Sequence, residues 1–227
     1  MIKFCYNRHM KLVYGTTNKA KITVMKKSVK HLGIELLSLD DVAIPKLNIE
    51  ENGSSPLDNA KIKAIAYYNE LKIPVFSCDS GLYIDELDDD RQPGLNVRGI
   101  GDYMNDDEAL TYYSALAEEF GGCVTARYQN AIYLIINDEH QYGYMGEDIA
   151  SERFYFVSKP HQKRVEGFPL DSISVHIESG KYYYDLDKSE EEYYDSGLIG
   201  AGYAAFFQRV LRESGFEPRL PRISEKH

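Results

Sequence analysis

Apolar residues along the chain form short β-type runs that alternate with stretches of helical spacing. The first run, residues 11–14, is followed by a small polar segment and then by apolar positions at steps of three and four over 22–32. A second β-type run covers 34–39. This order of strand, loop, helix and strand is typical of α/β proteins.

Two later helices carry clear start signals. Ser55, Pro56 and Asp58 combine an N-cap, a proline at the first helical position and an acidic residue in the first turn, which predicts a helix over 56–71. Asn105 and the acidic residues after it predict a second helix that ends at Gly121. A last helix is expected over 198–212.

The other apolar segments are β-rich, and the longest is 123–137. A strand at 74–77 is expected to end in a sharp Ser-Gly turn and to resume at 82–84. Segments 142–149 and 153–157 are expected to be antiparallel neighbours of the long strand, and further strands are expected at 167–175 and 182–184.

No repeat or linker-like change of composition divides the chain. We therefore expect one α/β domain over residues 10–215, with an elongated mixed β-sheet flanked by helices and with two lobes around a cleft. Residues 1–9 are interpreted as an appendage or an upstream start, and 216–227 as a C-terminal tail.

Composition narrows the possible partners. The chain has 26 Lys and Arg against 36 Asp and Glu, a net charge of −10, which disfavours non-specific binding to nucleic acid or anionic membranes. No apolar stretch approaches the roughly 20 residues needed to span a bilayer. Three cysteines without CxxC spacing fit a reducing compartment, so we expect a cytoplasmic protein.

The segment 15–21, with sequence G-T-T-N-K-A-K, lies between a predicted strand and a predicted helix. Small residues, hydroxyls and lysines at a helix N-terminus suit a phosphate group. An ordinary strand-to-helix loop explains this segment equally well.

Glu50, Glu51 and Asp79 are placed so that two or three carboxylates can meet at one edge of the sheet. Such oxygen ligands suit Mg²⁺, which binds through one or two carboxylates together with substrate phosphates. Taken singly, the glutamates are also compatible with a solvated acidic loop, and Asp79 with an Asx-turn.

Together these segments resemble the inosine triphosphate pyrophosphatase family in order and spacing. Residues 16–21 resemble its T-G-N-x-x-K loop, and residues 51–64 resemble its E-T-G-x-x-x-x-x-N-A-x-x-K-A motif. Residues 79–85 resemble the end of D-D-S-G-L-x-x-D, and 167–171 resemble G-F-G-Y-D-P. Shorter similarities occur at 93–98, 126–128 and 146–147.

The resemblance implies an α/β fold with a central nucleotide cleft and Mg²⁺-dependent hydrolysis of nucleoside triphosphates to monophosphate and pyrophosphate. It implies a homodimer and a role in removing non-standard purine nucleotides from the pool. Asp79 would orient or deprotonate the attacking water, and Glu51 and Asp79 would ligate the metal. The implied substrate-binding residues are Thr16, Asn18 and Lys21 at the phosphates, Ser80, Phe168 on the base and Asp171 on the nucleoside.

The chain also departs from the family pattern. Cys78 replaces a second acidic residue, and the late S-H-R-G motif, whose His and Arg recognise a 6-keto purine, falls near 196–200, which contains neither. Lys163, in a basic cluster with Lys159 and Arg164, is a candidate substitute phosphate ligand, or part of a solvated loop. The tyrosines at 182–184 and 193–194 can stack on a base or fill the core.

Two other function classes remain open. A nucleotide-binding or sensing protein of the same fold, with altered base specificity or without catalysis, would explain Cys78 and the missing His-Arg pair. An acidic protein-interaction domain would gain no thermal stability from Mg²⁺ and nucleotide.

Overall fold

The computed structural model describes residues 10–99, 104–187 and 198–215. The predictions for 1–9 and 216–227, the tyrosines at 193–194 and residues 196–197 of the S-H-R-G position lie outside the described residues.

The fold is built on one seven-stranded sheet, with strand order β2-β1-β3-β4-β6-β7 and β5 beside β4. The strands are β1 (Met10–Tyr14), β2 (Ile34–Leu37), β3 (Val75–Ile84), β4 (Cys123–Ile135), β5 (Gln141–Tyr144), β6 (Phe154–Val157) and β7 (Ser174–His176). The helices are α1 (Lys19–Val29), α2 (Pro56–Leu71), α3 (Asp106–Glu119) and α5 (Leu198–Glu213).

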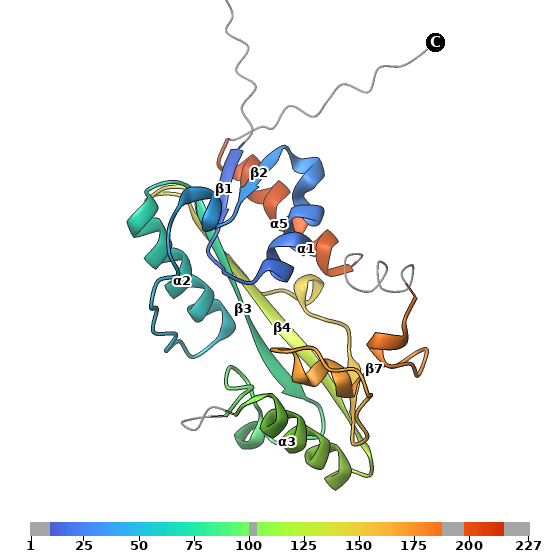
Figure 1. Ribbon diagram of the computed structural model, residues 1–227. Helices are drawn as coiled ribbons and strands as arrows, with labels where there is room; N and C mark the ends of the chain where they lie inside the picture. The colour runs from blue at the N-terminus through green and yellow to red at the C-terminus, as the bar shows by residue number, and fades with distance from the viewer. Residues whose placement is uncertain (1–9, 100–103, 188–197, 216–227) are drawn as a thin grey trace, which may run out of the picture.

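Strand direction changes across the sheet. β1 pairs in parallel with β2 and β3, whereas the β3–β4, β4–β5, β4–β6 and β6–β7 pairs are antiparallel. Figure 1 shows the two long strands β3 and β4 running from an upper lobe with β1, β2, α1, α2 and α5 to a lower lobe with α3 and β7. The expected elongated, mixed α/β sheet with two lobes is confirmed.

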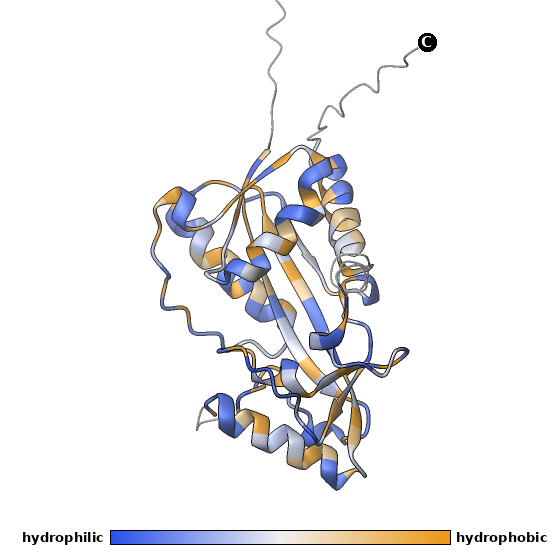
Figure 2. Cartoon of the chain, turned by 45° about the vertical axis from the view of Figure 1, so that its right-hand side comes forward, coloured by the Kyte–Doolittle hydropathy of each residue, from blue (hydrophilic) through white to orange (hydrophobic). Residues whose placement is uncertain are grey.

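Each lobe has its own buried cluster. Phe76 and Phe207 belong to the cluster beneath α1 and α5, and Tyr113 and Phe156 belong to the cluster beneath α3. A third, smaller cluster includes Tyr67 of α2. Figure 2 shows apolar residues toward both ends of the two long central strands and polar residues in their middle sections.

Both predicted helix starts are correct. The side chain of Ser55 accepts a hydrogen bond from the Asp58 backbone N–H at the start of α2. At the start of α3, Asn105 and Glu108 form a reciprocal capping box. These caps satisfy backbone N–H groups that have no partner inside the helix.

Four predictions for the β-rich segments are wrong in detail. The turn expected between 77 and 82 is continuous strand, because every residue of β3 pairs with β4. The segment 167–175 is mainly a 3₁₀ turn, Pro169–Ile173, and 182–184 overlaps a second one, Tyr183–Asp185. Similarly, 142–149 holds strand only to Tyr144 and then a 3₁₀ turn at Glu147–Ile149.

Among residues 10–99, 104–187 and 198–215, no helix has the length and apolar character that crossing a membrane requires. Cys78 is buried and Cys123 is exposed, and both are free thiols.

Candidate active site

The site begins where β3 extends beyond its parallel neighbour. β1 pairs with β3 only at Val75 and Phe76. The last contact is the hydrogen bond that the Gly15 N–H, just after β1, donates to the Phe76 carbonyl. The next residues of β3, including Asp79 and Ser80, keep β4 on one side and face loops on the other. Loops beyond the carboxyl ends of parallel strands are a common place for ligand sites in α/β proteins.

The approach of the β1 loop to β3 depends on Gly15. A methyl group at its Cα would clash with Ser77 Oγ and would lie 2.7 Å from the ring of Tyr67. Ser77 also donates a hydrogen bond of 3.2 Å to the Gly15 carbonyl oxygen. The glycine therefore lets the loop lie directly against β3 and α2.

A cavity of about 270 Å³ opens at this junction, and lysine side chains converge on it. Lys21 comes from the first turn of α1, Lys46 from the loop before α2, and Lys63 from α2 itself. The cavity is also lined by Gly15, Thr16, Thr17, Leu47, Asn48, Ile49, Glu51, Tyr67 and Cys78. We call it the lysine cavity, and its cations suit a polyphosphate.

Asn18 shapes the entrance to α1. Its side-chain oxygen accepts a hydrogen bond of 3.1 Å from the Lys21 backbone N–H, and its own N–H donates to Thr16 Oγ1 at 3.2 Å. Asn18 is therefore the helix cap, and the positive end of α1 lies beside the lysine cavity. The structure brings the predicted residues Thr16, Asn18 and Lys21 to one place.

Lys63 is the electrostatic centre of the site. Its Nζ lies 2.8 Å from Glu51 Oε2 and 2.8 Å from Asp79 Oδ1, and the Lys63 and Asp79 side chains are largely buried. Burial by itself lowers the pKa of this ammonium, but Asp79 and Glu51 outweigh burial and raise the pKa of Lys63. The Lys63 ammonium thus joins the two carboxylates, and we call Glu51, Lys63 and Asp79 the triad.

Sequence reasoning did not select Lys63 as a functional residue. It is the lysine of the N-A-x-x-K-A motif, so the signal was present in residues 59–64. What the motif could not show is that this lysine joins the two carboxylates expected at the metal.

Glu51 and Asp79 fit a magnesium site. They come from different elements and already converge on one cation, the Lys63 ammonium. Among the described residues there is no cluster of three or more His, Cys, Asp or Glu side chains suited to a metal. Mg²⁺ needs no such cluster, because it is held by one or two carboxylates with waters and substrate phosphates.

Cys78 does not replace the missing acidic ligand. Its side chain is buried beside Tyr14, and burial raises the pKa of the thiol to about 11. The thiol is therefore protonated near neutral pH, and it is neither the carboxylate nor the hard oxygen ligand that Mg²⁺ prefers.

Phe168 and Asp171 line a second cavity, of about 130 Å³, in the lower lobe with Arg98 and Tyr128. The Phe168 side chain is 42% exposed, which leaves an aromatic face available for stacking. Phe168 and Asp171 were predicted to bind the base and the nucleoside, and the structure places both on this cavity.

The loop that carries Phe168 is held by Asp106 at the start of α3. Asp106 accepts a hydrogen bond of 2.7 Å from Gly167 N and an ion pair of 2.8 Å from Arg98. The bond from Gly167 and then the Arg98 guanidinium lower the pKa of Asp106. This contact fixes the position of the loop and was not predicted from the sequence.

A third cavity, of about 390 Å³, shares Tyr128 and Asp171 with the second. The rest of its lining consists of Ser151, Glu152, Phe154, Ser174, Tyr183, Tyr184, Leu186 and Ile199. We call it the aromatic cavity. Tyr183 and Tyr184 therefore line a cavity rather than forming only core, and Ile199 brings the start of α5 to it.

Lys163 lies beside Tyr184 and not at the lysine cavity. Its Nζ is 4.4 Å from the centre of the Tyr184 ring, and it is not among the residues that line the lysine cavity. The structure therefore does not bring Lys163 together with Lys21, Lys46 and Lys63.

Ser80 lies between the two regions. Its hydroxyl donates a hydrogen bond of 2.6 Å to the Asn130 side-chain oxygen, and the Asn130 amide donates to the Ile149 carbonyl at 2.8 Å. Two residues of β3 mark the two regions: Cys78 lines the lysine cavity, and Leu82 pairs with Tyr128, which lines both lower cavities. They are four residues apart. At roughly 3.3 Å per residue this is about 13 Å, a span suited to an extended nucleotide.

Comparisons with known proteins agree with this architecture. A protein named dITP/XTP pyrophosphatase from Aquifex aeolicus is 41% identical over 78 residues, which cover 34% of this chain and 37% of that protein. Another of the same name from Thermus thermophilus is 28% identical over 190 residues, covering 82% and 86% of the two chains.

Among solved structures, a HAM1 protein from Coxiella burnetii has a TM-score of 0.70 at 21% identity, over 88% of this chain and 99% of that one. This likeness confirms the α/β fold. The profile of the Ham1 family matches residues 12–190, a span that includes both the lysine cavity and the Phe168 loop. The chain therefore belongs to the Ham1 family.

Proposed function

We propose that this protein hydrolyses nucleoside triphosphates to nucleoside monophosphate and pyrophosphate. Membership in the Ham1 family and relatives named dITP/XTP pyrophosphatase support nucleoside triphosphate hydrolysis. The observation that carries the proposal is the Lys63 ammonium held between Glu51 and Asp79 on the wall of a lysine-lined cavity.

The lysine cavity is the proposed phosphate end of the site. Lys21, Lys46 and Lys63 reach it from separate elements, and the N-terminus of α1 adds the positive end of the helix dipole. In a chain of net charge −10, this local excess of cations marks where a triphosphate is attracted.

The lower lobe is the proposed base end. Phe168 offers an exposed ring, Asp171 a hydrogen-bond acceptor, and Tyr128 a wall shared by both lower cavities. An aromatic face binds any base by stacking, so this end holds the nucleoside while the phosphates occupy the lysine cavity.

Asp79 is the proposed catalytic residue. Its Oδ1 is held by Lys63, which leaves the second carboxylate oxygen to orient the attacking water and to accept its proton. The lysines neutralise charge on the phosphate oxygens as the anhydride bond breaks. No covalent intermediate on the chain is needed.

Glu51 and Asp79 are the proposed ligands of Mg²⁺. When bound, the metal would neutralise phosphate charge and polarise the phosphoryl oxygens. Lys63 would then move from bridging the two carboxylates to contacting the phosphates and Asp79. Homodimer formation, a cytoplasmic location and removal of non-standard purine nucleotides from the pool are further parts of the proposal, supported by family membership.

The test is pyrophosphate release from ITP, XTP, dITP and the standard nucleotides, with Mg²⁺ and with a chelator. We expect metal-dependent release, with ITP, XTP and dITP as better substrates than ATP. Absence of turnover on every nucleotide would refute the proposal. If the enzyme cleaves only ATP or only a pyrimidine nucleotide, the proposed hydrolysis reaction stands, but the proposed removal of non-standard purine nucleotides is refuted. Tight binding without hydrolysis would favour the nucleotide-sensing alternative.

A further inference from the structure

Two buried polar atoms without a hydrogen-bond partner belong to residues of the aromatic cavity. They are Glu152 Oε1 and the Tyr184 hydroxyl, and among the described residues the third such side-chain atom is Ser114 Oγ on α3. A buried polar atom without a partner is costly, and more so in a carboxylate. Two of them on one cavity indicate that a ligand completes their hydrogen bonds.

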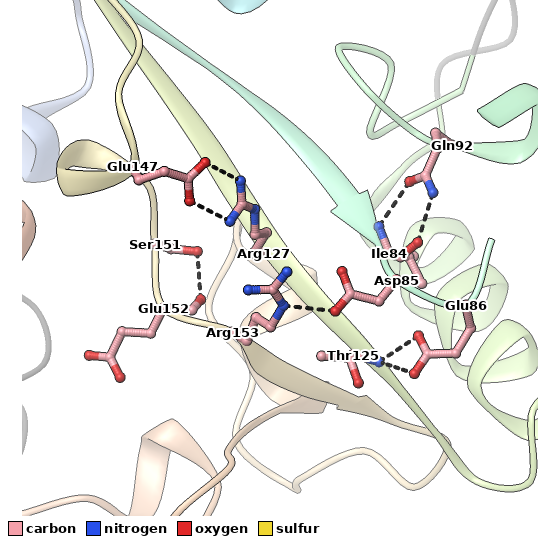
Figure 3. A network of polar contacts seen from close by, with 10 residues as sticks. All are labelled: Ile84, Asp85, Glu86, Gln92, Thr125, Arg127, Glu147, Ser151, Glu152 and Arg153. Atoms are coloured by element: carbon pink, nitrogen blue, oxygen red, sulfur yellow. Dashed lines mark hydrogen bonds and ion pairs between the residues drawn. The ribbon is translucent and has the colours of Figure 1, made fainter. Parts of the chain in front are cut away.

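Two neighbouring carboxylates, Glu147 and Asp85, are bound by arginines, whereas Glu152 is not. Arg127 binds both oxygens of Glu147, and Arg153 binds Asp85. Figure 3 shows the Glu152 side chain extending away from these two arginines. The chain therefore has cations close by but does not pair them with Glu152.

His176 explains the orientation of the other Glu152 oxygen. The Ser179 backbone N–H donates to His176 Nδ1, so in the neutral ring Nε2 carries the proton. His176 Nε2 lies 4.0 Å from Glu152 Oε2. One oxygen of the carboxylate is thus directed toward a buried donor, and Oε1 has no hydrogen-bond partner among the described residues.

The chemistry of this cavity differs from that of a phosphate site. Its lining holds the carboxylates of Glu152 and Asp171 and the rings of Tyr128, Phe154 and Tyr183. Anionic groups repel phosphate, whereas aromatic rings stack on a base and carboxylates accept hydrogen bonds from base N–H groups.

We propose that Glu152, assisted by the Tyr184 hydroxyl, selects the nucleobase through its N–H donors. This inference rests on the proposed function. The favoured bases have an imino N–H beside a carbonyl, since the carboxylate accepts from the N–H and the phenol donates to the carbonyl. In adenine and cytosine the corresponding ring nitrogen carries no hydrogen and is an acceptor. It would face the carboxylate oxygen, which is also an acceptor, and the two would repel each other. Glu152 is therefore a specificity-determining residue where the sequence lacks a His-Arg pair.

The experiment compares ITP with N1-methyl-ITP, which lacks the imino hydrogen. For the wild type we expect methylation to lower kcat/KM about tenfold or more, because a site built for an N–H rejects an analogue without it. In Glu152→Ala the two substrates should differ by less than about threefold, and Tyr184→Phe should weaken ITP use severalfold. Glu147→Gln is the control, because its carboxylate is bound by Arg127 and it does not line the cavity.

If methylation lowers kcat/KM equally in the wild type and in Glu152→Ala, the role of Glu152 is overturned. The proposed function still stands in that case, provided that the enzyme hydrolyses ITP. Failure of the wild type to cleave any nucleotide would overturn the proposed function instead. Calorimetric binding of IMP and N1-methyl-IMP to the same variants keeps the inference testable in that case. Weaker binding of the methylated compound by the wild type but not by Glu152→Ala supports it, and equal binding overturns it.

Discussion

The lysine cavity and the aromatic cavity lie at two regions of the same long strand pair and have opposite character. The first gathers Lys21, Lys46 and Lys63 from three elements, and the second gathers Glu152 and Asp171 among aromatic rings. A nucleotide is complementary to this pair of cavities, because it has an anionic phosphate end and an uncharged aromatic end. Under the proposed function, this difference would orient the substrate by charge as well as by shape.

The comparison also shows which end keeps the family pattern. In the lysine cavity, Lys21, Glu51 and Lys63 lie in segments that match the family motifs, and Cys78 is a departure from them. The aromatic cavity includes Ile199, next to the position of the missing His-Arg pair. We therefore expect the chemistry to be ordinary for this family and the selection of the base to be particular to this chain.

The largest effect is expected at the catalytic carboxylate. Asp79→Asn removes the proton acceptor, so kcat should fall by about 10²–10⁴, with a smaller change in KM. Pyrophosphate release measures this directly. Glu119→Gln, which breaks an exposed ion pair with Arg91, is the control and should retain activity. Near-normal kcat in Asp79→Asn would remove Asp79 from the mechanism.

The next largest effect is expected at Lys63. Lys63→Met removes the ammonium that holds Asp79 and Glu51, and hydrogen bonds to charged groups are worth about 1.5–3 kcal/mol, so kcat/KM should fall roughly 10- to 150-fold. Lys61→Met, on the same helix but beside Tyr133, should change it less than about twofold. Similar losses in both variants would indicate a general charge effect and not the triad.

A smaller effect is expected at the base end. Phe168→Ala removes a stacking surface, so KM for ITP should rise about tenfold while kcat changes little. Phe120→Ala is a matched control, because Phe120 is 36% exposed and Phe168 42%. An unchanged KM would show that the base does not stack on Phe168.

The smallest effect is expected at Cys78. Burial raises the pKa of its thiol to about 11, above the usual value near 8.5, so the folded protein keeps this thiol protonated below pH 9. Because the unfolded chain loses this proton at lower pH than the folded protein, the folded state loses stability as the pH rises from about 8.5 toward 11. Iodoacetamide at pH 8 should label exposed Cys123 and leave Cys78 largely unmodified, as measured by peptide mass spectrometry. Equal labelling would show that Cys78 is accessible.

Much of the fold could be predicted from local patterns. Helix caps at Ser55 and Asn105 are local signals, and the structure confirms both. The turn expected at Asp79 and Ser80 was wrong because local Ser-Gly chemistry favours a turn, while pairing with β4 about fifty residues away imposes a strand.

The site was predictable to a similar extent. The motifs indicated that Thr16, Lys21, Glu51 and Asp79 act together, and the structure gathers the first three on one cavity with Asp79 bound to Lys63. The absence of a partner for Glu152 Oε1 could not be predicted, because it depends on which arginines the fold brings to other carboxylates.

The central claim is that the scissile bond lies between the α- and β-phosphates, with the phosphates in the lysine cavity and the base in the lower lobe. Product analysis by anion-exchange chromatography of ITP treated with enzyme and Mg²⁺ tests it most directly. The account predicts equal amounts of IMP and pyrophosphate, with no IDP at any time. Accumulation of IDP and inorganic phosphate would contradict it.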